Sequence, residues 1–188
     1  MRHHTNKFFI YLCEYNLQNI LNIKKMKNLN TLFIATILSS LVFFACGDGA
    51  MSPQTFNNTA IDIFKGANKV LDEFDSKITA GVKSKDLPSI AVAAESALEK
   101  VDSHTEKLKA INAPQSAEEY KEAVLKSLGE VKTIIETGKK YAELKEGYSK
   151  SEFNALEKEY NKNRKKLSET LQNVATAQAE FMKAISTK

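Results

Sequence analysis

The sequence predicts an all-α protein, an antiparallel up-down-up-down four-helix bundle preceded by a lipoprotein signal peptide. Two observations carry this prediction. From Ser52 onward, apolar residues recur in alternating steps of three and four, which is the period of amphipathic helices. Before Ser52, a basic segment leads into an apolar run that ends at Cys46. The first pattern predicts the fold, and the second predicts where the protein is attached.

The apolar run Thr31–Ala45 has the properties of a signal-peptide core. It is 15 residues long, whereas a membrane-spanning helix needs roughly 20 residues. Three lysines precede it within residues 24–27. A short buried helix, the alternative, would show a polar stripe, and this run has almost none. We therefore expect cleavage before Cys46 and attachment of diacylglycerol to its thiol.

The chain is accordingly expected to have four parts. Residues 1–25 are predicted to be an over-extended gene start, with translation beginning at Met26. Residues 26–45 form the predicted signal peptide and residues 46–51 a lipidated tether. Residues 52–188 form the helical bundle domain, which is long enough for one domain with a sizeable core.

The net charge of +4 comes from the part that precedes Cys46. Five basic residues and Glu14 lie before this cysteine, which leaves 22 basic and 22 acidic residues from Cys46 onward. A neutral domain gives no support for nucleic-acid binding, which requires a clustered basic patch. Cys46 is also the one cysteine of this part, so a disulfide framework or a zinc site built from cysteines is excluded.

The first helix is expected to begin with Ser52 as N-cap and Pro53 as its first residue. We expect Gly81 to end it as the C-cap residue. The second helix begins near Asp86–Pro88 and ends at Asn112–Pro114, because proline cannot continue a helix. The apolar positions are Phe56, Ala60, Ile63, Phe64, Ala67, Val70, Leu71, Phe74 and Ile78 in the first helix, and Ile90, Ala94, Ala97, Val101, His104, Leu108 and Ile111 in the second.

The third and fourth helices are each expected to begin with a capping box, at Ser116–Glu119 and at Ser149–Glu152. Gly129 and Gly138 lie inside the third helix, where each costs about 1 kcal/mol relative to Ala, so we expect close helix approach or a bend there. The third segment ends at Gly147. Its apolar positions are Tyr120, Val124, Leu128, Val131, Ile135, Tyr141 and Leu144, and those of the fourth helix are Phe153, Leu156, Tyr160, Leu167, Leu171, Val174, Phe181 and Ile185.

A polar stretch, Asn161–Lys166, interrupts the apolar pattern of the fourth helix, and we expect a bend or greater exposure there. This helix, about 55 Å long if straight, is long enough to extend past its partners. Four amphipathic helices with short connections favour the antiparallel bundle. The alternative is an elongated pair of hairpins with a longer coiled-coil section, because heptad-like spacing is sustained in the first two helices.

Few residues could carry chemistry. His104 is the one histidine after Cys46, and Val101 stands three residues before it, so the Glu-x-x-His pairs of di-iron bundles are absent. His104 could be a metal or haem ligand, but a lone histidine on an apolar stripe is usually a packing residue. No nucleophile with a base or phosphate-binding loop is found. We therefore predict that the protein is not an enzyme and that it needs no cofactor or metal.

One surface is expected to contact a protein partner. Aromatic and basic residues gather around the connection between the third and fourth helices, a combination that is common at interfaces. The predicted contact residues are Tyr141, Tyr148, Tyr160, Arg164, Lys165 and Lys166. The alternative is that these charges form a solvated helix face with i,i+4 pairs.

Five short segments resemble a family of small helical surface lipoproteins from Gram-negative bacteria. These are the Phe-Ala-Cys46 ending of the signal, Phe56-Asn-x-x-Ala60, Ala113-Pro114, the Tyr120-Lys-Glu-Ala segment and Ala177-Gln178-Ala-Glu-Phe181. The molecular function of that family is uncharacterised, and some members are exposed at the cell surface. The resemblance implies no catalytic residues.

The sequence thus predicts a protein anchored to the outer membrane by a lipid on Cys46, which acts by binding or structure. Whether it faces the surface or the periplasm is left open. The main alternative is a periplasm-facing chaperone or stress protein that holds client polypeptides. A third class, a cofactor carrier, would depend on His104.

Overall fold

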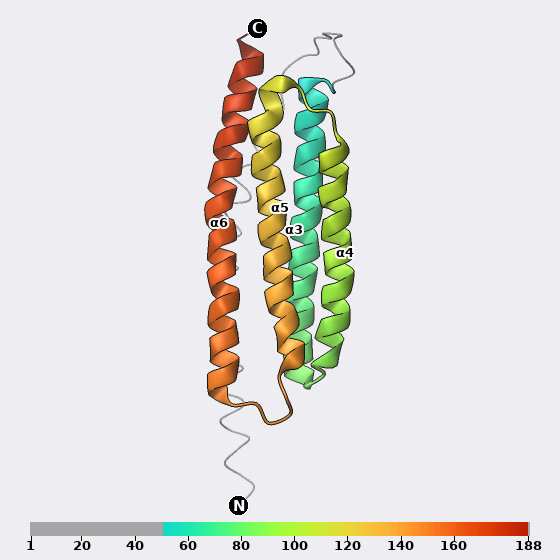
Figure 1. Ribbon diagram of the computed structural model, residues 1–188, viewed down its shortest axis with the longest axis vertical. Coiled ribbons are helices and arrows are strands. Elements are labelled where there is room, and N and C mark those ends of the chain that lie inside the picture. Colours follow the sequence, from blue (N-terminus) through green and yellow to red (C-terminus); the bar gives the residue numbers. More distant parts are fainter. Residues whose placement is uncertain (1–50, 188) are drawn as a thin grey trace, which may run out of the picture. The chain divides into compact units, whose positions relative to one another are not determined.

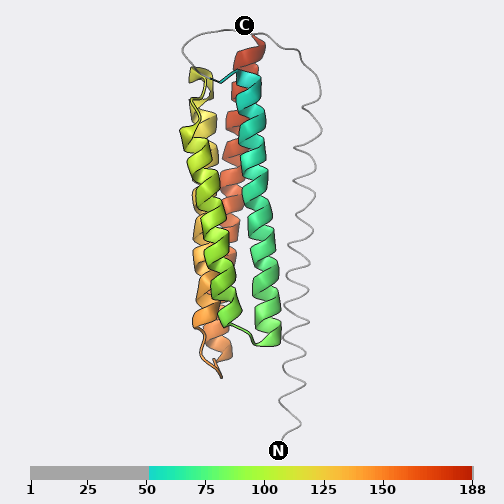
Figure 2. The ribbon, with the colours of Figure 1, turned by 90° about the vertical axis from the view of Figure 1, so that its right-hand side faces the viewer.

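The computed structural model describes residues 51–187. They form four α-helices and two short 3₁₀ helices, which run antiparallel, up-down-up-down, in one bundle (Figures 1 and 2). The elements are α3 (Pro53–Ser84), α4 (Pro88–Ala110), η1 (Gln115–Ala117), α5 (Glu118–Lys139), η2 (Lys140–Glu143) and α6 (Lys150–Ser186). The predicted all-α bundle is confirmed, and the alternative of an elongated pair of hairpins is not what the chain adopts.

The predicted signal peptide, the lipidation site Cys46 and the predicted gene start all lie outside the described residues. Between residues 51 and 187, the helices are not apolar over a long enough stretch for any of them to cross a membrane.

The start of α3 is as predicted, and its end is not. Ser52 Oγ accepts a hydrogen bond from the Thr55 amide at 3.2 Å, and Pro53 is the first helical residue. The helix continues past Gly81 to Ser84, and Lys85 takes the left-handed conformation with φ 60°. Gly81 instead permits close packing, because a Cβ there would lie 2.6 Å from Ile90 Cγ1.

The connection between α4 and α5 replaces the predicted capping box. The chain passes through η1, and Ala117 is the N-cap of α5 without any side-chain cap. The ammonium of Lys121 donates to the carbonyls of Lys109 and Ile111, at 3.2 and 2.6 Å. The end of α4 is therefore capped from α5, which is a favourable place for a cation.

The capping box at the start of α6 is confirmed. Ser149 Oγ accepts from the Glu152 amide at 3.2 Å, and the Glu152 carboxylate accepts from the Ser149 amide at 2.7 Å. The helix is unbroken from Lys150 to Ser186, and its C-terminal end extends past the neighbouring helices (Figure 1). Of the bend or greater exposure expected at Asn161–Lys166, greater exposure is found: four of these residues are exposed, and Asn163 and Arg164 are half-buried.

The helices do not pack with equal closeness. Backbone contact is extensive between α3 and α4, between α4 and α5, and between α3 and α5, so these three helices pack against one another. α6 has extensive backbone contact with α5, and little with α3 or α4. The bundle is therefore a three-helix unit with a fourth helix on one of its sides.

Two apolar clusters form the core. One, at the end formed by the α3–α4 turn and the α5–α6 connection, contains Phe74, Ile90, Val101 and Ile135 among others. The other, toward the α4–α5 connection, is centred on Phe56, Tyr120 and Phe181, whose ring centroids are all 5.9 Å apart. Buried polar residues lie near their boundary, namely Ser127, Glu130 and Thr170.

The two glycines of α5 have different surroundings, and they predict opposite effects of alanine. A Cβ at Gly138 would lie 2.6 Å from Phe74 Cε1, whereas a Cβ at Gly129 would meet nothing within 4 Å. We expect Gly129→Ala to stabilise the protein by about 0.5–1 kcal/mol through helix propensity. Gly138→Ala should destabilise it by about 1–3 kcal/mol through overpacking. Urea unfolding at neutral pH measures both. Two changes of the same sign would contradict this account of the close approach.

Candidate functional site

The predicted contact residues separate into buried and exposed members. Tyr141 is 4% exposed, so its ring packs in the core and not on the surface. Tyr148 is half-buried and stacks on Phe153 with ring centroids 5.9 Å apart. Lys165 is exposed, with Glu169 at 4.0 Å. Partner binding by these residues stays a prediction.

Tyr160 and Arg164 converge on Asp75 of α3. The Tyr160 hydroxyl donates a hydrogen bond to Asp75 Oδ1, and Arg164 Nη2 lies 2.9 Å from Asp75 Oδ2. The side chains of Arg164 and Asp75 are 21% and 29% exposed, so this pair is better shielded from water than the other ion pairs of the described chain. The carboxylate of Asp75 thus contacts two groups of α6 that lie one turn apart: it accepts a hydrogen bond from Tyr160 and forms an ion pair with Arg164.

Burial sets the protonation of this cluster. It raises the pKa of Asp75 above its ordinary value, against the lowering effects of Arg164 and of the Tyr160 hydrogen bond. Burial also raises the pKa of Tyr160 well above its ordinary value, and the negative charge of Asp75 adds to this. Tyr160 therefore keeps its proton at neutral pH and acts as a hydrogen-bond donor between two helices. A protonated tyrosine cannot act as a catalytic base.

Further polar pairs continue this contact along α6. Lys166 Nζ lies 3.0 Å from Glu130 Oε1, Asn163 donates to Thr137 Oγ1 at 2.9 Å, and Gln178 donates to Asn57 Oδ1 at 2.9 Å. We call these residues, together with the Asp75 cluster, the α6 seam. Its members are Asn57 and Asp75 of α3, Glu130 and Thr137 of α5, and Tyr160, Asn163, Arg164, Lys166 and Gln178 of α6.

The α6 seam is incompletely satisfied. Asn57 is fully buried and Glu130 is 7% exposed. Asn57 Nδ2 and Glu130 Oε2 are both buried without a hydrogen-bond partner. A buried polar group without a partner costs about 1–3 kcal/mol, so these atoms weaken the interface that they belong to.

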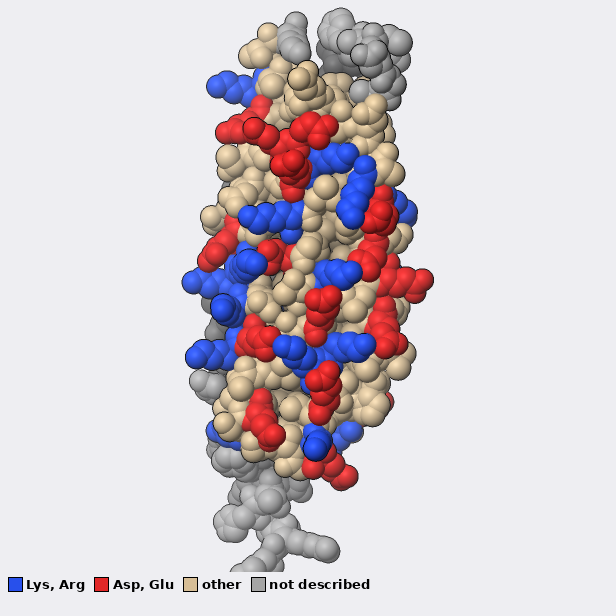
Figure 3. All heavy atoms as spheres, viewed as in Figure 1, with Lys and Arg blue, Asp and Glu red and all other residues tan. Residues whose placement is uncertain are grey.

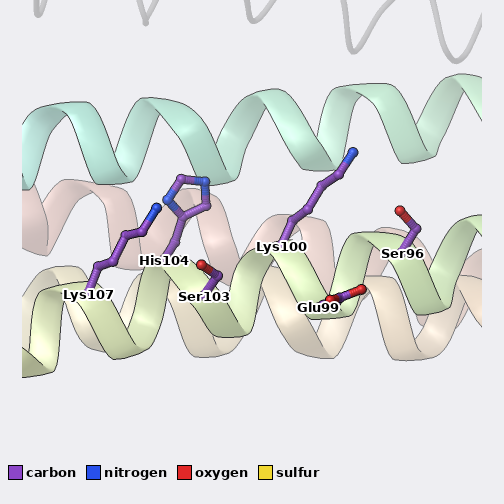
Figure 4. Close-up of a pocket in the computed structure, with 6 residues that line it drawn as sticks. All are labelled: Ser96, Glu99, Lys100, Ser103, His104 and Lys107. Carbon is purple, nitrogen blue, oxygen red and sulfur yellow. The ribbon is translucent and has the colours of Figure 1, made fainter.

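His104 lies at the rim between α3 and α4, and is half-buried where the sequence predicts a core position. Its ring rests on Gly66, where a Cβ would approach His104 Cε1 to 2.5 Å. Together with Lys100, Lys107 and neighbouring polar residues of α4 it lines a shallow hollow of about 390 Å³ (Figure 4). Residues 51–187 contain no group of three or more His, Cys, Asp or Glu side chains placed to hold a metal ion.

A second hollow, of about 500 Å³, lies between the start of α5 and the end of α6. Tyr120 and Phe181 stack beneath it, and both are 2% exposed. Its rim carries the carboxylates of Glu118, Glu119 and Glu180 and no basic residue. Burial raises the pKa of Tyr120 well above its ordinary value. The three carboxylates would favour a cation in this hollow. The rings of Tyr120 and Phe181 are almost fully buried, so they offer little surface for a bound molecule to stack on.

The charged surface does not favour one kind of partner. On the face shown in Figure 3, basic and acidic side chains alternate over the helices and do not gather into a field of one sign. Val92 is the one large apolar side chain that is strongly exposed in the described part, at 70%. No protein-family model, curated protein or solved structure matches this chain.

Sequence reasoning missed Asn57, Asp75 and Glu130. Asn57 and Asp75 directly follow Phe56 and Phe74 of the predicted apolar stripe, so their places at its edge could have indicated polar residues that face a neighbour. Their partners on α6 could not be identified, because pairing depends on the relative height and rotation of two helices far apart in sequence.

His104 predicts a pH dependence of stability. Burial lowers its pKa below the ordinary 6.5, and Lys107 lowers it further. Because the folded pKa lies below the unfolded one, the unfolded state binds the proton more tightly, and stability falls as the pH drops below about 6.5. We expect unfolding free energies measured in urea to fall more between pH 7.5 and pH 5.5 for the natural chain than for His104→Gln. Equal losses in the two proteins would contradict this.

Proposed function

We propose that this protein is a lipid-anchored helical lipoprotein of the outer membrane, and that it acts by binding or structure and not by catalysis. The basic segment and the apolar run that end at Cys46 support this most directly. If Cys46 carries a lipid, one contact indicates where the anchored chain would enter the bundle. The Met51 amide donates to the Asn112 carbonyl at 3.0 Å, which fixes the first described residue at the bundle end formed by the α4–α5 connection. Cys46, the proposed lipid site, is five residues earlier.

This entry point would orient the bundle. Five residues reach at most about 17 Å when fully extended, so a lipid on Cys46 would hold the α4–α5 connection close to the membrane. α3 has 32 residues, which correspond to about 48 Å. The opposite end, with the turn at Lys85–Leu87 and the connection at Leu144–Ser149, would then project away from the membrane. Tyr148 of the predicted contact surface lies in that projecting connection.

The polar side chains of the described residues also support a binding or structural role. Two carboxylates join helices: half-buried Asp75 pairs with Arg164, and buried Glu130 pairs with Lys166. Tyr160 serves as a donor in the same contacts. Catalysis would instead require such groups to converge on a site that a substrate can enter.

Lipid attachment is tested by the two cysteines of the chain. Cys46→Ser should abolish incorporation of a labelled fatty acid and move the protein from the membrane fraction to the soluble one. Cys13→Ser is the matched control and should change neither, because residue 13 precedes the proposed start at Met26. Fatty-acid labelling that persists in Cys46→Ser would contradict the proposal.

The same labelled cells distinguish the two candidate roles. Protease added to intact cells should remove the bundle if it is displayed at the surface. If the protein is spared until the outer membrane is opened, the alternative of a periplasm-facing chaperone or stress protein that holds client polypeptides is favoured.

A further inference from the structure

α6 is held differently from the other three helices. α3, α4 and α5 contact one another closely along their backbones, whereas α6 has extensive backbone contact with α5 alone among the α-helices. Figures 1 and 2 show α6 on one side of the bundle, next to α5. Removing α6 would therefore leave every pairwise backbone contact among the other three helices in place.

The fully buried apolar residues of α6 are interrupted in the middle of the helix. They are Phe153, Leu156, Leu167, Val174 and Phe181, in a helix of 37 residues. Other apolar residues of α6 pack partly buried against the two core clusters, namely Tyr160, Leu171, Ala177, Met182 and Ile185. Between Leu156 and Leu167 this helix has no fully buried residue. The polar residues of the α6 seam fill this interval. α5, with 22 residues, has six buried apolar or aromatic side chains, one buried glycine and three buried polar side chains.

Polar groups therefore supply the contact between Leu156 and Leu167 together with the partly buried ring of Tyr160. Such pairs are weaker net contributors than apolar burial, because both partners give up water on pairing. Two seam residues, Asn57 and Glu130, also have buried atoms without a partner. Both gain water when α6 moves away, which lowers the free energy of separation.

We propose that α6 opens as one cooperative unit while α3, α4 and α5 stay folded. The closed helix covers a face on which Asp75 and Glu130 lie beside apolar residues, and the open form presents that face to solvent. In the closed form, α6 therefore shields from solvent a surface of α3 and α5 that contains both acidic and apolar residues. This device is independent of lipid attachment, since it depends on residues 53–186 alone. Local opening of this kind occurs where apolar burial is low.

Native-state hydrogen exchange of the full chain, followed by mass spectrometry in low urea, tests the proposal. Protected amides of α6 should share an opening equilibrium constant at least about tenfold larger than that of α3–α5. Asp75→Asn should increase exchange of all four helices by about tenfold. The variant weakens the ion pair with Arg164 and the hydrogen bond from Tyr160 in the closed state, and both contacts are already absent in the partly open and the unfolded states.

Ile90→Val supplies the matched control. Ile90 is fully buried on α4, which has little backbone contact with α6. This variant should speed exchange of α3–α5 by about two- to tenfold and leave α6 unchanged, because the lost packing persists until the three-helix unit unfolds. An equal increase in α6 and in α3–α5, or a single opening constant for all four helices of the natural chain, would overturn the proposal.

Discussion

The contact of the Asp75 carboxylate with Tyr160 and Arg164 is the interaction that places α6 on the rest of the bundle. Apolar packing alone would leave the height of α6 loosely defined, since its buried apolar residues stop at Leu156 and resume at Leu167. The carboxylate of Asp75 is half-buried, so separating it from Arg164 and Tyr160 while it stays shielded from water would be unfavourable. The cluster therefore selects one height and one rotation of the helix.

The rest of the arrangement follows from this division between a packed unit and an attached helix. In α3–α5, glycines at positions 81 and 138 let Ile90 and Phe74 approach a neighbouring backbone closely. α6 has extensive backbone contact with α5, and it also joins its neighbours through long polar side chains, from Lys166 near the middle to Gln178 further on. The polar ends of such side chains tolerate water at the rim. The same protein thus combines a tightly packed unit with a seam that can open.

The number, order and most ends of the helices could be predicted from the sequence. The spacing of apolar residues and the capping of helix ends both depend on residues that are close together in the chain. The box at Ser149 formed as expected, but the one at Ser116 did not, since Lys121 and η1 organise that connection through contacts between helices. Gly81 was likewise predicted to be a C-cap residue, but it lies inside α3 and permits close packing against Ile90. The seam could not be predicted, because Asp75 and Arg164 are 89 residues apart in the sequence and nothing local marks them as partners.

A double-mutant cycle on Asp75→Asn and Arg164→Met tests most directly whether this cluster positions α6. The free energies of unfolding of the natural chain, the two single variants and the double variant give the coupling between the two side chains. We expect a coupling of about 1–3 kcal/mol, well above the 0.2–1 kcal/mol or so typical of exposed ion pairs. A coupling near zero would contradict the account, because the pair would then be no more than a surface contact.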